Sequence, residues 1–218
     1  MGMTMAEKII AQHAGLPQVF AGQYVDAKVD LLMAGDACAE LYDVFRTVGI
    51  SEVWDPLKVI GLVDHEVPAS TVLAAEQDKL RRAFVNEFGL KHWYDVGRGG
   101  ICHQVLPEKG HVVPGSLIVG CDSHTTSYGA FNAAGTGIPV VEAYWVAAKG
   151  SLWFRVPETI LFEITGEMPP YVMGKDVALY IAGTYGTDFA NYKSIEFTGE
   201  GVHKMSLSSR WTIANMGV

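Results

Sequence analysis

The sequence has little cysteine, no long apolar run and fewer basic than acidic residues, and each shortage excludes a class of protein. Its three cysteines, Cys38, Cys102 and Cys121, form no CxxC or zinc-type spacing. We therefore expect neither a disulfide framework nor a zinc finger, and we assign the chain to the reducing cytoplasm. No run approaches the roughly 20 apolar residues of a membrane span, so we expect no membrane partner.

The charge balance argues against nucleic acid as the main partner. The chain has 16 lysines and arginines against 24 aspartates and glutamates, which gives a net charge of −8. Nucleic acids and anionic membrane surfaces carry the same sign and would not be attracted to it. A small anionic substrate remains compatible with this balance, because a local site can be positive on an acidic protein.

Apolar segments of strand length alternate with segments of helical periodicity. Helices are predicted at the N-terminus, at residues 37–48, 70–88, 140–149 and 175–185, and from residue 208 onward. Strands are predicted at residues 23–33, 57–63, 92–96, 117–119, 159–165 and 194–198. This alternation predicts an α/β fold with a mixed, mainly parallel sheet and helices on both faces. We expect residues 1–218 to form a single region of this kind.

Polar residues follow three of the predicted strands at the point where each strand ends. Because parallel strands end at a common edge of the sheet, we expect these side chains to converge there. Three imidazoles and two carboxylates would then be available for general acid-base chemistry or metal binding. The residues are Asp64 and His65 after Val63, Arg98 to His103 after Val96, and Asp122, Ser123 and His124 after Val119.

Each of these groups also has a purely structural interpretation. An Asp-Ser-His sequence after a strand is more often a helix cap and turn than a catalytic set. Taken alone, His65 is more typical of a turn. Arg98, Gly99 and Gly100 fit either a surface turn or a site where backbone amides and a guanidinium bind an anion. The other histidines, His13, His92, His111 and His203, have no informative acidic neighbour and are interpreted as surface or structural residues.

Several long motifs, in order from end to end, resemble the aconitase superfamily, and within it the large subunits of 3-isopropylmalate dehydratase and of its homoaconitase and methylmalate-type relatives. The motifs are MGMTMAEKI at the start, YDVGRGGICHQVLPEKG at 94–110, GCDSHTTSYGA at 120–130, LWFRVPETI at 152–160 and EFTGEGV at 196–202. The resemblance implies an aconitase-like α/β/α domain.

This resemblance implies a hydro-lyase that reversibly dehydrates and rehydrates a hydroxy di- or tricarboxylic acid, as in leucine biosynthesis. A [4Fe–4S] cluster acts as the Lewis acid in such enzymes. Matched by motif, Asp64 and His65 resemble the pair that assists departure of the hydroxyl, and His103 resembles a second histidine partnered by Asp122. Ser123 matches a site serine and His124 a third histidine, while Asn215 resembles an asparagine near the cluster.

The chain also departs from the family pattern. The family holds its cluster with three cysteines, one alone and a later CxxC, which would lie well beyond residue 218. Cys38, Cys102 and Cys121 do not match them. The acid expected to orient His124 would fall one position past Val218. We therefore expect the N-terminal part of a large subunit, truncated before the cluster-binding half, inactive as this chain alone, without metal ligands of its own and completed by a small swivelling subunit.

Two other functions fit the same residues. The first is a non-catalytic module that binds an anion or a partner protein at these strand ends. The second is an enzyme with a single metal ion bound by His65, His103, His124 and Asp122.

Overall fold

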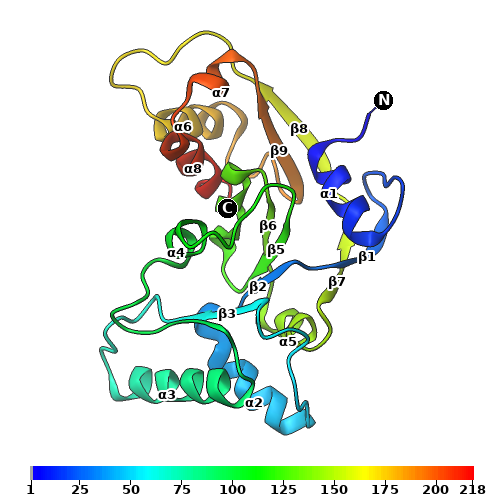
Figure 1. The fold of residues 1–218 in the computed structure, drawn as a ribbon. Helices are drawn as coiled ribbons and strands as arrows, with labels where there is room; N and C mark the ends of the chain where they lie inside the picture. The colour runs from blue at the N-terminus through cyan, green and yellow to red at the C-terminus, as the bar shows by residue number, and fades with distance from the viewer. Residues whose placement is uncertain (1) are drawn as a thin grey trace.

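The computed structural model describes residues 2–218, which are built around a parallel sheet with strand order β4-β3-β2-β5-β6 (Figure 1). All residues of β2, β3 and β5 are buried, as expected of strands that are covered on both faces. These three adjacent strands form the centre of the sheet. The strand bounds are Leu31–Met33 for β2, Val59–Leu62 for β3, His92–Tyr94 for β4, Leu117–Gly120 for β5 and Ala134–Gly137 for β6.

One face of the sheet is covered by α2 (Cys38–Val48), α3 (Val72–Glu87) and α5 (Val140–Lys149). Leu32, Val59 and Val119 point to this side and pack in one cluster with Phe45 of α2 and Phe84 of α3. Because side chains alternate along a strand, the neighbouring strand residues point to the opposite face. Gly49, in the left-handed conformation, ends α2 as predicted.

The opposite face is covered by the short helix α4 (Cys102–Glu108) and the 3₁₀ segment η2 (Ser123–Phe131). Met33, Ile60 and Ile118 pack here with Leu106 of α4 and the fully buried Tyr128 of η2. Helices on both faces of a parallel sheet confirm the predicted α/β class. Both elements that carry chemistry-bearing side chains on this face are therefore fixed by core packing.

Residues 23–33, predicted as one strand, form two strands in different sheets. β1 (Tyr24–Lys28) pairs antiparallel with β7 (Ser151–Arg155), whereas β2 joins the central sheet. The break occurs at Asp30, whose carboxylate accepts hydrogen bonds from the backbone N–H of Leu117 and from the ring of His13 in α1 (Met5–Ala14). The prediction was wrong because alternation of apolar residues does not report a change of strand partner.

The last part of the chain forms a second parallel pair of strands, β8 (Glu158–Glu163) and β9 (Lys193–Thr198). The helices α6 (Gly174–Tyr185), α7 (Glu200–Lys204) and α8 (Leu207–Asn215) gather beside this pair (Figure 1). The bounds of β8, β9 and α6 and the start of α8 agree with the predicted ones to within two residues, whereas α7 was not predicted. The α8 helix also contacts η2, so this layer reaches the sheet face that carries η2.

Six elements were not predicted: the helices α4 and α7, the 3₁₀ segments η1 (Gly35–Ala37) and η2, and the strands β6 and β7. The sequence suggested only a connection around Pro107, because proline removes a backbone donor inside a helix. In the structure Pro107 lies in the last turn of α4, and buried Val105 and Leu106 fix this helix on the sheet. Tertiary packing therefore forms a seven-residue helix that would be marginal in isolation.

Two features of the structure relate to the expected absence of disulfides and of membrane-spanning segments. The cysteines are free, with Cys38 and Cys102 buried and Cys121 partly exposed. In the part of the chain that the structure describes, no helix combines the length and the hydropathy that crossing a membrane requires.

Gly135 in β6 tests how tightly η2 is packed on the sheet. A Cβ at this position would overlap the carbonyl oxygen of Thr125 and would lie 3.1 Å from the Cβ of Tyr128. Gly135→Ala should therefore lower the free energy of unfolding by about 1–3 kcal/mol, measured by urea denaturation, because η2 must move away from β6.

Gly183→Ala is the matched control. Gly183 lies inside α6, and an added Cβ would have nothing within 4 Å. The same substitution should stabilise the chain by about 0.5–1 kcal/mol there, because alanine has the higher helix propensity. Equal effects at the two positions would contradict close packing of η2.

Candidate active site

The carboxylate of Asp122 lies at the centre of the predicted cluster of polar residues. Asp122 follows β5 and is the N-cap of η2, so its Oδ1 accepts a hydrogen bond from the backbone N–H of His124 at 2.7 Å. The same oxygen accepts from Nε2 of His103 at 2.7 Å. His103 is the second residue of α4 and is only 6% exposed. Ordinary capping of η2 thus places the carboxylate against a buried imidazole from the neighbouring helix.

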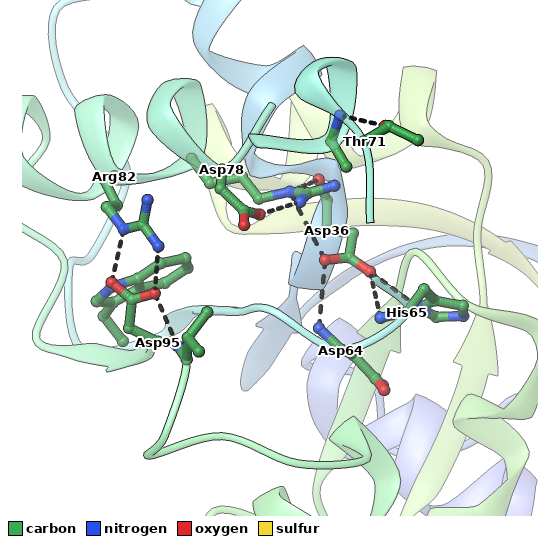
Figure 2. Close-up of polar contacts among 11 residues, drawn as sticks. Asp36, Asp64, His65, Thr71, Asp78, Arg82 and Asp95 are labelled. Atoms are coloured by element: carbon green, nitrogen blue, oxygen red, sulfur yellow. Dashed lines mark hydrogen bonds and ion pairs between the residues drawn. The ribbon is translucent and has the colours of Figure 1, made fainter. Parts of the chain in front are cut away.

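His65 reaches the same carboxylate from the end of β3. Its Nε2 lies 3.5 Å from Oδ2 of Asp122, and its side chain is 65% exposed. The other ring nitrogen, Nδ1, lies 2.9 Å from Oδ2 of Asp36, and the backbone N–H of His65 donates to the same oxygen at 3.1 Å (Figure 2). His65 is therefore placed between two carboxylates, one at each ring nitrogen.

Asp36 was not predicted as a site residue. It lies just beyond β2, in the 3₁₀ turn η1 (Gly35–Ala37), between the strands that carry Asp64 and Asp122. A signal was present in the sequence, because Asp36 is one more acid shortly after an apolar run.

Tyr128 was missed as well. Its hydroxyl lies 3.3 Å from Nδ1 of His103, and no sequence pattern distinguishes this tyrosine from an ordinary core residue.

Asp64 precedes His65 in the chain, but its carboxylate accepts a hydrogen bond from a backbone N–H group. Its Oδ2 accepts a hydrogen bond from the N–H of Cys102 at 2.8 Å, at the start of α4. The sequence had suggested Asp64 and His65 as a working pair. In the structure Asp36 holds the ring of His65, whereas Asp64 fixes the first turn of α4 and with it the position of His103.

Ser123 and His124 form the exposed side of the cluster. Nδ1 of His124 lies 3.4 Å from Oδ1 of Asp122, and Oγ of Ser123 lies 3.5 Å from the same ring nitrogen. The side chain of His124 is 48% exposed. All three predicted histidines therefore lie within 3.5 Å of Asp122, and two of them face solvent.

Arg98, Gly99 and Gly100 lie in the exposed turn between β4 and α4. The backbone N–H groups of Arg98 and Gly99 donate to the carbonyl of Asp95 at 2.8 and 2.9 Å. A Cβ on Gly99 would lie 2.9 Å from the carbonyl oxygen of Tyr94 and 3.2 Å from that of Val63. Close approach of these backbones accounts for Gly99, and anion binding at this turn stays a prediction.

Asn215 connects α8 to η2. Its Nδ2 donates to Oγ of Ser127 at 3.0 Å, and Oγ1 of Thr126 donates to the carbonyl of Ala214 at 3.2 Å. The end of the chain consequently lies beside η2. An open pocket of about 380 Å³ is lined there by Cys121, Asp122, Ser123, Thr126, Thr136, Gly137, Ile138, Gly217 and Val218.

Burial and charge separate the pKa values of His65 and His103, two of the three histidines beside Asp122. Partial burial lowers the pKa of His65, but the hydrogen bond to Asp36 and the carboxylates of Asp64, Asp36 and Asp122 outweigh it, so the pKa lies above its ordinary value. Burial lowers the pKa of His103, and the hydrogen bond to Asp122 only partly offsets this effect. His65 therefore holds a proton at a pH where His103 is neutral.

The hydrogen bonds also assign the tautomer of His103. Burial raises the pKa of Asp122, but bonds from His103 and from the backbone of His124 lower it more strongly, so the carboxyl is ionised and accepts. Nε2 of His103 must then carry the proton that is donated to Asp122. Nδ1 accepts from the hydroxyl of Tyr128, whose pKa is raised by burial and which stays protonated. His103 is thus a neutral donor, and its hydrogen bond holds the carboxylate of Asp122 in position.

The cluster does not form a metal site among residues 2–218. No group of three or more His, Cys, Asp or Glu side chains in this range is placed to hold a metal ion. The histidine rings are arranged around Asp122, within 3.5 Å of its carboxylate, instead of converging on one point. This arrangement does not favour the single-metal alternative.

The cysteine thiols do not fit an iron–sulfur cluster either. Cys38 is fully buried in the core and Cys102 is 3% exposed. Cys38 packs in the core on one face of the sheet and Cys102 in the core on the opposite face, so these thiols do not point to a common cluster.

The separation of the two histidines can be measured by titration of ¹⁵N-labelled imidazoles. The midpoint of His65 should lie above, and that of His103 below, the ordinary value of about 6.5. The sign follows from the contacts: carboxylates favour the charged form of His65, and burial disfavours that of His103. Two-bond ¹H–¹⁵N spectra should also show His103 with its proton on Nε2. The reverse order of midpoints would contradict the assigned roles.

Comparison with known proteins identifies the family of the chain. Residues 7–218 match the model of the aconitase family (aconitate hydratase). The chain is 47% identical over 219 aligned residues to the 3-isopropylmalate dehydratase large subunit of Moorella thermoacetica, covering 100% of this chain and 52% of that protein. It is 49% identical to the 3-isopropylmalate dehydratase large subunit 1 of Methanopyrus kandleri, with the same coverage.

A third relative is named as a different enzyme. The probable methanogen homoaconitase large subunit of Methanothermobacter thermautotrophicus is 45% identical over 221 residues, covering 99% of this chain and 51% of that protein. The chain spans about half the length of the curated relatives it matches. Because the family model covers nearly the whole sequence, the chain belongs to the aconitase family.

Proposed function

We propose that this chain supplies the histidine-bearing half of the active site of a hydro-lyase that dehydrates and rehydrates a 2-hydroxy diacid such as 3-isopropylmalate. The observation that carries the proposal is the set of three imidazoles around Asp122, one of them inclined to be charged and one neutral. Relatives named 3-isopropylmalate dehydratase and homoaconitase large subunits support the reaction class. The choice between these acids remains part of the proposal.

Dehydration needs a proton donor, because hydroxide is a poor leaving group. His65 is suited to this role, since its raised pKa favours the protonated form and more than half of its side chain is exposed. In this proposal Nε2 of His65 donates a proton to the hydroxyl as its C–O bond breaks, while a base supplied by the other half of the site would take the proton from the neighbouring carbon. Both transfers reverse during hydration, when His65 takes a proton back from water. Asp122, 3.5 Å from Nε2, stabilises the charged ring before the transfer.

The other residues would position substrate and carboxylate. His103 holds Asp122 through a buried hydrogen bond, and Asp64 holds the helix that carries His103. Ser123 and His124 lie at the exposed side of the cluster, and Ser123 lines the open pocket, so they can donate hydrogen bonds to substrate carboxylates. Arg98, Gly99 and Gly100 would contribute to anion binding, and Asn215 would mark the side from which the rest of the site approaches.

A family [4Fe–4S] cluster would supply Lewis-acid chemistry, but the cysteines of this chain do not fit it. We therefore propose that residues 1–218 are one aconitase-like region and that the cluster ligands lie in a further half. A small subunit is the expected partner, because the relatives are named large subunits. We also propose a cytoplasmic location, because three cysteines without a pairing pattern are typical of a reducing compartment.

The purified 218-residue chain should have no dehydratase activity of its own. With 3-isopropylmalate we expect no formation of the unsaturated diacid and, after reconstitution with iron and sulfide, no visible absorption band of a cluster. Turnover together with such a band would contradict the proposed division of the site.

The role of His65 can be tested in a hybrid enzyme. Residues 1–218 would be joined to the C-terminal half of the Moorella thermoacetica large subunit and produced with a matching small subunit. His65→Gln should lower kcat by about 10²- to 10⁴-fold, because it removes the proton donor.

His203→Gln is the matched control for the hybrid. His203 is an exposed residue of α7, distant in sequence from the strand ends that form the site. It should leave kcat unchanged. A His65→Gln hybrid as active as the parent would rule out His65 as the donor.

A further inference from the structure

We propose that Asp36 is the positioning residue that fixes the ring of His65, and that Arg81 and Asp78 of α3 hold Asp36 in place. None of these three residues belongs to the site predicted from the sequence. The consequence for catalysis rests on the proposed function, in which His65 is the proton donor. The positioning itself concerns only contacts inside this chain.

One carboxylate binds both the backbone and the ring of His65. Oδ2 of Asp36 accepts from the N–H of His65 at 3.1 Å and lies 2.9 Å from Nδ1 of its ring. Oδ1 accepts from the N–H of Asp64 at 3.4 Å. Because an ionised carboxylate only accepts, the proton of neutral His65 must lie on Nδ1. Nε2, the nitrogen that faces Asp122, is then left free to exchange a proton.

Asp36 is itself held by a buried arginine, Arg81 of α3. Nε of Arg81 donates to the backbone carbonyl of Asp36 at 3.0 Å and lies 3.6 Å from its Oδ1. Nη1 of Arg81 donates to Oδ1 of Asp78. The side chains of Arg81 and Asp78 are 12% and 5% exposed, so both charges are largely removed from water. The chain of contacts runs from α3 through Asp36 to His65.

Burial makes a purely stabilising role for Arg81 and Asp78 an insufficient account. The desolvation penalty of a buried ion pair often equals or exceeds its Coulombic gain, so apolar residues would stabilise the same position at least as well. The guanidinium of Arg81 donates a hydrogen bond to the backbone carbonyl of Asp36, the residue that binds the ring of His65, and an apolar side chain could not make this bond. Fixing Asp36 is the specific effect of this pair.

The adjacent pair on the same helix provides a contrast. Arg82 makes two hydrogen bonds to Asp95, at 2.7 and 2.8 Å, with its side chain 42% exposed. This pair connects α3 to the turn after β4 and does not involve Asp36 (Figure 2). Arg82 therefore offers a matched control: the same residue type, the next position on α3 and an equally well-formed ion pair.

Charge and position predict opposite effects for Arg81. The charged groups that face His65 are the carboxylates of Asp36, Asp64 and Asp122, and the thiols of Cys102 and Cys121 that line the same small pocket stay protonated. If Arg81 acted by its charge alone, its removal would raise the titration midpoint of His65. If it acts by placing Asp36, its removal weakens the Asp36 contact and the midpoint falls.

The experiment is a pH titration of the ¹⁵N-histidine-labelled 218-residue chain by two-bond ¹H–¹⁵N spectra, with the His65 signal assigned from its loss in His65→Gln. In the parent chain, neutral His65 should carry its proton on Nδ1. Asp36→Asn should shift the midpoint of His65 downward, and Arg81→Gln should shift it downward as well. Arg81→Lys keeps the positive charge but loses the planar guanidinium, and it should also lower the midpoint of His65. This variant replaces Arg81→Gln if the latter does not fold.

Two control variants should leave the His65 midpoint unchanged. Arg82→Gln breaks the neighbouring ion pair, and Asp43→Asn removes a carboxylate from the exposed face of α2. An unchanged midpoint and tautomer in Asp36→Asn would overturn the proposal. A rise in Arg81→Gln, or no change in Arg81→Lys, would overturn the part assigned to Arg81.

The titration separates this proposal from the proposed function, because it requires no turnover. In the hybrid enzyme, Asp36→Asn should lower kcat by about 10- to 100-fold with little change in KM, as expected when the partner of a working histidine is lost. If the titration shifts as expected but His65→Gln leaves the hybrid fully active, the positioning stands and the function of His65 as donor fails.

Discussion

The hydrogen bond between Asp122 and His103 is the interaction on which the rest of the site depends. Asp122 caps η2 after β5, and His103 begins α4, so one bond of 2.7 Å joins the two elements that cover one face of the sheet. Because His103 is buried, its pKa is lowered and it donates as a neutral group. The carboxylate stays ionised and is available to the exposed ring of His65. Oδ1 of Asp122 therefore takes part both in the cap of η2 and in the hydrogen bond to the buried ring of His103.

A parallel sheet brings these groups together for a simple geometric reason. β3, β2 and β5 are adjacent, and each is followed by an acid: Asp64, Asp36 and Asp122. The carboxylates act on different partners, since Asp64 accepts from the backbone of α4, Asp36 fixes His65 and Asp122 binds His103. Three acids so close together would repel one another without these donors. Each one instead accepts hydrogen bonds from backbone or imidazole N–H groups.

Much of the fold could be predicted, but local patterns did not reveal contacts between distant segments. The buried strands β3 and β5 and the helix α3 were visible as apolar runs and as helical periodicity. By contrast, α4 is a short helix with a proline, and its position depends on Leu106 in the core. The break at Asp30 likewise depends on partners in α1 and β5. Sequence periodicity reports which face of an element is apolar, not which element covers it.

The α/β class, the family and the strand ends where polar side chains gather could all be read from the amino-acid sequence, because they follow from local order and from motifs. Only the tertiary structure decided how those side chains pair. It placed Asp36 against His65, turned Asp64 toward the backbone of Cys102 and buried Arg81 beneath the site. The physical reason is that hydrogen-bond partners and pKa values depend on distance and burial, and neither is fixed until α3, α4 and η2 pack on the sheet.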